Sequence, residues 1–128
     1  MASSLSLLLL VLCSLAAAQA RLRVFNLRAT GLPSDALGVS DGYVKVSCGA
    51  VSLGKTAVLH NQVNPWWEEE FAYLSAKEND ILRLEVFDSD LIFDDELGVC
   101  SRQLKKGTYD YQCSLEDGAS LYYSYTLY

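Results

Sequence analysis

The chain has 128 residues, of which 16 are acidic and 10 are basic, so its formal net charge at pH 7 is −6. This length suits one domain with a modest hydrophobic core. Beyond the first twenty residues, no apolar run approaches the roughly 18 residues that a membrane-spanning helix needs, which excludes such a helix from the rest of the chain.

The first twenty residues are predicted to be a secretory signal peptide. Residues 5–15 are almost entirely apolar, small residues follow as far as Ala20, and no charged residue precedes Arg21. An apolar run of this length and position is too short and too early for a membrane span. We therefore expect cleavage after residue 20, a secreted extracellular protein, and a single domain over residues 21–128.

The remainder of the chain consists mainly of short alternating apolar runs between Gly, Asn and Asp clusters, a pattern typical of β-strands. The last run is the clearest, because Leu121, Tyr123, Tyr125 and Leu127 share one face. The candidate strands are 21–29, 42–48, 55–59, 67–74, 81–88, 97–101, 107–115 and 120–128. Eight short strands at regular spacing predict an all-β fold, an eight-stranded antiparallel sandwich.

Three cysteines remain once the predicted signal peptide, which contains Cys13, is removed. Cys48 shares a strand face with Val44 and Val46, so we expect a buried core thiol. Cys100 and Cys113 flank a hairpin-sized segment and are the preferred disulfide pair, because disulfides persist outside cells. The alternative that Cys48 is exposed and links two chains as a dimer stays open, although we expect a monomer.

Aspartates concentrate in or beside two loops between the predicted strands. These are Asp35, Asp41, Asp88, Asp90, Asp94 and Asp95. If both loops lie at one end of the sandwich, the carboxylates repel one another and raise one another's pKa values. Calcium, which accepts six to eight oxygen ligands in flexible geometry, relieves this repulsion better than magnesium. Zinc and copper usually recruit His or Cys, and the chain contains one histidine, His60.

Three segments in the same order resemble the C2 domain family of calcium-dependent phospholipid-binding β-sandwiches: GLPSDALGVSDGYVKV (31–46), NPWWEEEF (64–71) and LEVFDSDLIFDDELG (84–98). The resemblance implies that five of the aspartates ligate calcium: Asp35, Asp41, Asp88, Asp90 and Asp95. The second loop is one residue shorter than is usual in the family, so Asp94 is an alternative or additional ligand.

The resemblance also gives a role to apolar residues at the loop tips, which in this family enter the membrane once calcium is bound. Here those residues are Leu37, Val39, Leu91, Ile92 and Phe93. An alternative is that the second tip folds inward or meets a protein partner.

The doubled acid, the predicted signal peptide and the cysteine positions are most similar to the C2 domains at the carboxyl end of perforins. We therefore expect a secreted accessory or defence protein, without a pore-forming domain, that binds phospholipid membranes peripherally with calcium. A calcium-stabilised protein-interaction module is the alternative. No nucleic-acid partner is expected, and the absence of G-x-S-x-G and H-E-x-x-H motifs argues against an enzyme.

Overall fold

The computed structural model describes residues 21–36 and 38–128, and for Asp35 it describes the backbone alone. The predicted signal peptide, residues 1–20, and the predicted tip residue Leu37 lie outside the described residues. Within the described part of the chain, no helix is long and apolar enough to cross a bilayer.

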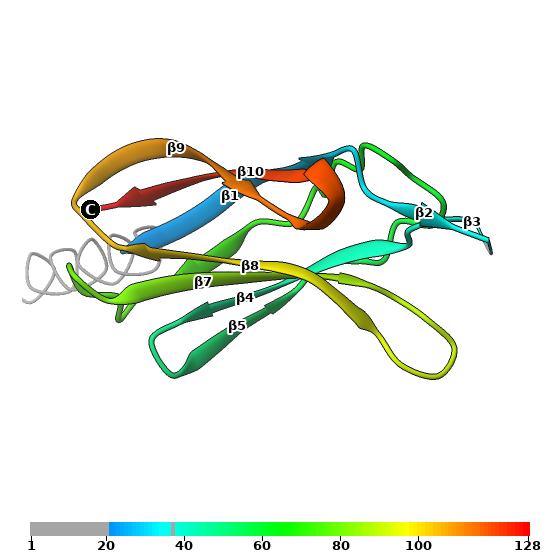
Figure 1. Cartoon of the computed structure of the whole chain (residues 1–128). Coiled ribbons are helices and arrows are strands. Elements are labelled where there is room, and N and C mark those ends of the chain that lie inside the picture. Colours follow the sequence, from blue (N-terminus) through cyan, green and yellow to red (C-terminus); the bar gives the residue numbers. More distant parts are fainter. Residues whose placement is uncertain (1–20, 37) are drawn as a thin grey trace, which may run out of the picture.

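Two four-stranded antiparallel sheets pack face to face, as the two layers in Figure 1 show, and this confirms the predicted all-β sandwich. The first sheet has the order β6-β1-β10-β9, with β1 (Leu22–Thr30), β6 (Phe71–Tyr73), β9 (Gly107–Ser114) and β10 (Ser120–Leu127). The second has the order β5-β4-β7-β8, with β4 (Gly42–Cys48), β5 (Val51–Lys55), β7 (Ile81–Asp88) and β8 (Asp95–Gln103). A small pair, β2 (Ser34–Asp35) and β3 (Gly38–Val39), and the 3-10 turn η1 (Glu116–Gly118) complete the described elements.

The core lies between the two sheets and follows from the alternation of apolar residues in the strands. In β4, Val44, Val46 and Cys48 are buried and Lys45 is exposed. The same period of two buries Leu84 in β7, and both strands thereby present one apolar face to the opposite sheet.

Two predicted strands differ from the structure. The strand expected over 55–59 is wrong, because β5 covers Val51–Lys55 and ends there. The side chain of Thr56 is buried at this point: its Oγ1 accepts a hydrogen bond from the Val44 N–H and donates one to the carbonyl of Ala57. The strand expected over 67–74 is confined to Phe71–Tyr73.

The predicted pairing of Cys100 with Cys113 is confirmed, and the disulfide links β8 to β9 and so joins the two sheets at one edge. The two strands are not hydrogen-bonded to each other, since they end different sheets. Beside the disulfide, the guanidinium carbon of Arg102 lies 3.8 Å from the centre of the Tyr111 ring. Cys48 is a free, buried thiol, as expected, and burial raises its pKa to about 11.

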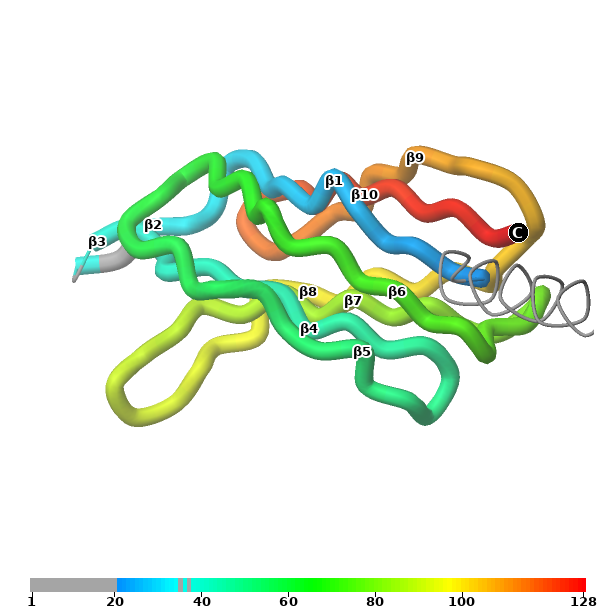
Figure 2. Tube along the Cα trace, turned by 180° about the vertical axis from the view of Figure 1, so that it is seen from behind, coloured from blue at the N-terminus to red at the C-terminus, as the bar shows by residue number. Residues whose placement is uncertain are grey.

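Three loops meet at the end of the sandwich opposite the carboxyl terminus. Figure 2 shows them in cyan, green and yellow: the segments that contain β2 and β3, residues 56–66, and residues 89–94. The antiparallel order explains this arrangement, because the end of β1, the start of β4, the end of β7 and the start of β8 all lie at that end.

Candidate functional site

Asp41, immediately before β4, is held in position by close packing around its neighbour, Gly42. A β-carbon at residue 42 would lie 2.9 Å from Leu32 Cδ1 and 3.2 Å from the Trp67 ring, so only glycine fits without a shift. The Trp67 Nε1–H also donates to the carbonyl of Gly42 at 3.1 Å. The buried tryptophan of the NPWW segment therefore fixes the backbone next to Asp41.

A β-bulge places Asp88 and Asp95 opposite each other. The register of β7 with β8 shifts between Val86, which pairs with Gly98, and Phe87, which pairs with Glu96. Leu97 is the extra residue, and as a result Asp88 at the end of β7 pairs with Asp95 at the start of β8. Two like charges directly across a strand pair are destabilising, and bulges often re-aim side chains beside functional sites.

Asp88 occupies a central position between two cavities. A cavity of about 100 Å³ is lined by Asp41, Asp88 and Asp90, together with Gly38, Val39, Asn61 and Ser89. A larger one, of about 370 Å³, is lined by Pro33, Ser34, Ser40, Asp88, Asp95, Glu96, Leu97, Glu116 and Asp117. The structure thus brings together residues from both acidic loops that the sequence predicts to form one site.

Backbone N–H groups connect these loops through their carboxylates. The Asp41 N–H donates to Asp88 Oδ1 at 2.8 Å, and the Asn61 N–H donates to Asp41 Oδ1 at 2.8 Å. His60 Nδ1 lies 3.4 Å from Asp41 Oδ2, although the side chain of His60 is mostly exposed. These contacts join all three loops of this end around Asp41.

Asp94 lines neither of these two cavities. Its carboxylate accepts hydrogen bonds from the Tyr43 hydroxyl and, at 3.1 Å, from the Asp90 N–H. The Tyr43 hydrogen bond is the main cause that lowers the pKa of Asp94, whereas the sequence predicts that mutual repulsion of carboxylates raises it. Burial, and then the same contact with Asp94, raise the pKa of Tyr43 to about 12. Of the two adjacent acids, the structure therefore places Asp95 and not Asp94 beside Asp88.

The apolar tip of the 89–94 loop is exposed. Leu91 is fully accessible to solvent, and Ile92 and Phe93 are 80% and 77% exposed. The alternative that these three residues fold inward as part of the core is therefore wrong. In the first loop, Val39 is half-buried against the smaller cavity, which makes it a weaker candidate for a tip residue.

The donor chemistry of this end fits calcium, because the candidate ligands are carboxylate oxygens. Within residues 21–36 and 38–128, however, no three Asp, Glu, His or Cys side chains already converge in a metal-binding arrangement. The side chain of Asp35 is not among those described. Asp41, Asp88, Asp90 and Asp95 are thus near one another without forming a closed site.

Several residues that line the site are not predicted from the sequence. Glu116 and Asp117 reach the larger cavity from η1, which follows β9, and Glu96 reaches it from β8. The acidic pair before Gly118 was the available signal, but only the tertiary fold brings it beside Asp88. The hydrogen bond from the Asn61 N–H to Asp41 is a backbone contact, which the residue type does not reveal.

Comparison with known proteins identifies the class of the domain. The sequence matches the profile of the C2 domain over residues 20–122. A solved structure described as "Structure of a C2 domain" is 58% identical in sequence and superposes with a TM-score of 0.80. The match covers 85% of this chain and 98% of the chain in that structure. The chain therefore belongs to the C2 domain family.

Among curated proteins, the chain is similar to rat perforin-1, with 33% identity over 103 residues that make up 78% of this chain and 18% of perforin-1. It is also similar to an Arabidopsis thaliana calcium-dependent lipid-binding protein, with 35% identity over 83 residues, 63% of this chain and 16% of that protein. The chain spans less than a fifth of the length of these relatives.

Proposed function

We propose that this protein is a calcium-dependent membrane-binding module that docks on phospholipid surfaces through the loop end of its sandwich. The observation that carries the proposal is the 89–94 loop, where Leu91, Ile92 and Phe93 are exposed beyond a pair of facing carboxylates. The name of the plant relative, a calcium-dependent lipid-binding protein, supports the same activity.

Calcium, when bound, would supply the positive charge that lets an acidic surface approach anionic lipid. We propose that Asp35, Asp41, Asp88, Asp90 and Asp95 hold it, with Asp88 shared between the two cavities. Asp94 has a different role, since it accepts hydrogen bonds from Tyr43 and from the Asp90 N–H and so holds the loop that presents the tip.

The tip then contributes apolar burial. Fully burying a large apolar side chain contributes about 1.5 to 3 kcal/mol, so three partly buried residues supply several kcal/mol before the costs of association are subtracted. This is enough for reversible docking and well below the insertion of a membrane-spanning helix.

We propose that the protein acts outside cells. The likeness to perforin-1 and the predicted signal peptide favour a secreted module that acts as an accessory or defence protein at membrane surfaces. Extracellular modules often bind calcium with dissociation constants of about 10⁻⁴ to 10⁻³ M, so docking would be supported outside cells and suppressed in calcium-poor compartments. As a C2 domain, the chain is a binding module and no catalytic step is assigned to it.

Liposome co-sedimentation tests the proposal, with anionic and neutral vesicles and with calcium or a chelator present. We expect sedimentation only with calcium, and a strong reduction when Leu91, Ile92 and Phe93 are all replaced by Ser. Leu74→Ser is a matched control, because Leu74 is exposed but follows β6 at the opposite end of the sandwich. Vesicles left unoccupied by a folded, calcium-binding protein would favour the protein-interaction module instead.

A further inference from the structure

Two arginines of β1 lie on the outer face of the first sheet, and each stacks on an aromatic ring. The guanidinium carbon of Arg23 lies 4.4 Å from the centre of the Phe25 ring, and that of Arg28 lies 5.0 Å from the centre of the Tyr122 ring. Arg23 also binds the carboxylate of Glu70 through two hydrogen bonds, of 3.0 and 2.8 Å.

Arg28 differs in its polar contacts. Among the described residues, no carboxylate oxygen lies within 4.0 Å of its guanidinium, and its one hydrogen bond is a long one of 3.4 Å to the carbonyl of Asn26. A planar guanidinium is suited to bind a carboxylate with two parallel hydrogen bonds, as Arg23 does. Arg28 therefore has the same preference, but no carboxylate among the described residues pairs with it.

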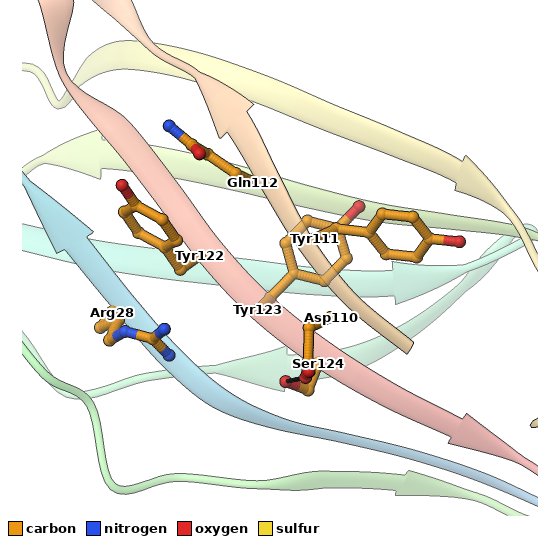
Figure 3. A pocket seen from close by; sticks show the side chains of 7 residues that line it. All are labelled: Arg28, Asp110, Tyr111, Gln112, Tyr122, Tyr123 and Ser124. Atoms are coloured by element: carbon orange, nitrogen blue, oxygen red, sulfur yellow. Dashed lines mark hydrogen bonds between the residues drawn. The ribbon is translucent and has the colours of Figure 1, made fainter. Parts of the chain in front are cut away.

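Arg28 lies at the side of a shallow cavity of about 230 Å³, shown in Figure 3, that spans β1, β10 and β9. Strand pairing brings five of its seven lining residues onto one sheet face: Arg28 pairs with Tyr122 and Tyr122 with Gln112, while Asp110 and Ser124 form the neighbouring pair. These side chains alternate with core residues, so they project from the outer face of the sheet.

The polar groups that line the cavity are only partly used. Ser124 donates to one oxygen of Asp110, and the amide nitrogen of Gln112 donates to Ser120 Oγ at 3.2 Å. Within the described contacts, the second Asp110 oxygen, the Gln112 carbonyl oxygen and the Tyr122 hydroxyl have no protein partner. A ligand would therefore meet hydrogen-bond acceptors on the β9 side and a cationic planar donor on the β1 side.

We infer that this cavity binds an acidic sugar, meaning a saccharide unit that carries a carboxylate. The carboxylate would pair with Arg28, and hydroxyl groups on the ring would donate to Asp110 and Gln112. The cavity is small compared with typical ligand pockets of about 300 to 1,000 Å³, which suits one saccharide unit. A single basic and a single acidic side chain also distinguish it from a site for a simple anion.

The position of this cavity separates it from the membrane-docking end. It lies on the flank of the first sheet, whereas the 89–94 loop projects beyond the end of that sheet (Figure 1). When the tip is docked, the head groups of the same bilayer lie at the loop end and not at the flank of the sheet. A glycan chain that extends from a surface is therefore a better candidate ligand for this cavity than a lipid head group. The site needs none of the loop aspartates, so its test is independent of the proposed calcium-dependent docking.

The experiment is a titration of the isotopically labelled protein, in the presence of a chelator, followed by two-dimensional NMR. The probes are glucuronic acid and N-acetylneuraminic acid, with glucose, acetate and glycerophosphoserine as comparisons. We expect saturable shifts for an acidic sugar at the Arg28 side-chain N–H and at the Tyr122 and Gln112 amides. Glucose and acetate should each bind at least about tenfold more weakly, because glucose lacks the carboxylate that pairs with Arg28 and acetate lacks the hydroxyl groups that donate to Asp110 and Gln112.

Arg28→Gln should weaken acidic-sugar binding by about tenfold or more, and Asp110→Asn should weaken it less. Arg23→Gln, which removes the equivalent arginine from the same strand, should leave the affinity within about twofold. The spectra of all three variants show directly whether each is folded. The inference is overturned if neither acidic sugar gives saturable shifts, if glucose or acetate binds as tightly, if glycerophosphoserine binds more tightly, or if Arg28→Gln has no effect.

Discussion

The body of the sandwich and its acidic loop end differ in how they use the same kinds of residue. In the body, Val44, Val46 and Leu84 are fully or almost fully buried, and a disulfide closes one edge. At the loop end, Leu91 is fully exposed, and Asp88 faces another carboxylate across a strand pair. The body therefore supplies the stability, and the loop end keeps exposed apolar residues and facing carboxylates that do not favour the folded state of the isolated chain.

Two leucines, one buried in the body and one exposed at the loop tip, should differ most in their effect on stability. Leu84→Ala removes a fully buried side chain and should lower the free energy of unfolding by about 2 to 5 kcal/mol. Leu91→Ala removes a fully exposed one and should change it by less than about 0.5 kcal/mol. Urea denaturation of the two variants measures both values. A large destabilisation by Leu91→Ala would mean that the tip packs in solution.

The aspartates of the loop end should affect binding much more than folding. Replacing Asp88 and Asp90 by Asn together should weaken calcium-dependent docking by at least about a hundredfold, because calcium affinity follows the number of charged ligands. The amide oxygen that Asp88→Asn introduces can still accept the hydrogen bond from the Asp41 N–H, so the fold should persist. Co-sedimentation measures docking and thermal unfolding measures the fold; unchanged docking would refute the assigned site.

The two adjacent acids of this loop provide a finer test. Asp95→Asn should lower calcium affinity by about tenfold, because it removes the carboxylate opposite Asp88. Asp94→Asn should change it by no more than about twofold, since that carboxylate is directed to Tyr43. Calorimetric titration with calcium compares them. If Asp94→Asn has the larger effect, the bulge does not determine the ligand set.

Within the body, the buried thiol should produce a smaller effect that depends on pH. The pKa of Cys48 rises from about 9 to about 11 on folding, mainly through burial. Its contribution to stability is therefore fully present below about pH 9 and is lost as the pH rises through about 11. Cys48→Ala should show a shallower alkaline decline in melting temperature than the unchanged protein; identical profiles would show that other groups, such as Tyr43, account for the decline.

Much of the fold was predictable because alternation of apolar and polar residues determines which strand face is buried. The strands around Val44, Leu84 and Tyr125 follow that rule. The strand at Val51–Lys55 does not, because exposed residues and a glycine conceal its pattern, and the run after Lys55 is the more apolar of the two.

The sequence predicts most of the residues of the candidate site but little of how they are arranged in space. Sequence order and motif spacing indicate which aspartates belong together, but the choice between Asp94 and Asp95 depends on a bulge at Leu97 and on a hydrogen bond from Tyr43. Both are tertiary features, as is the approach of Glu116 to the larger cavity. Spacing along the chain carries no information about any of the three.

In the proposed function, calcium binding by the loop aspartates enables the exposed tip to dock on phospholipid. The most direct measurement is a calorimetric calcium titration of the protein, alone and with anionic liposomes, followed by sedimentation of the same samples. We expect that calcium binds, that liposomes tighten its apparent affinity, and that the protein sediments with the vesicles only when calcium is present. A folded protein that binds no calcium, or that sediments equally with a chelator present, would contradict the proposed function.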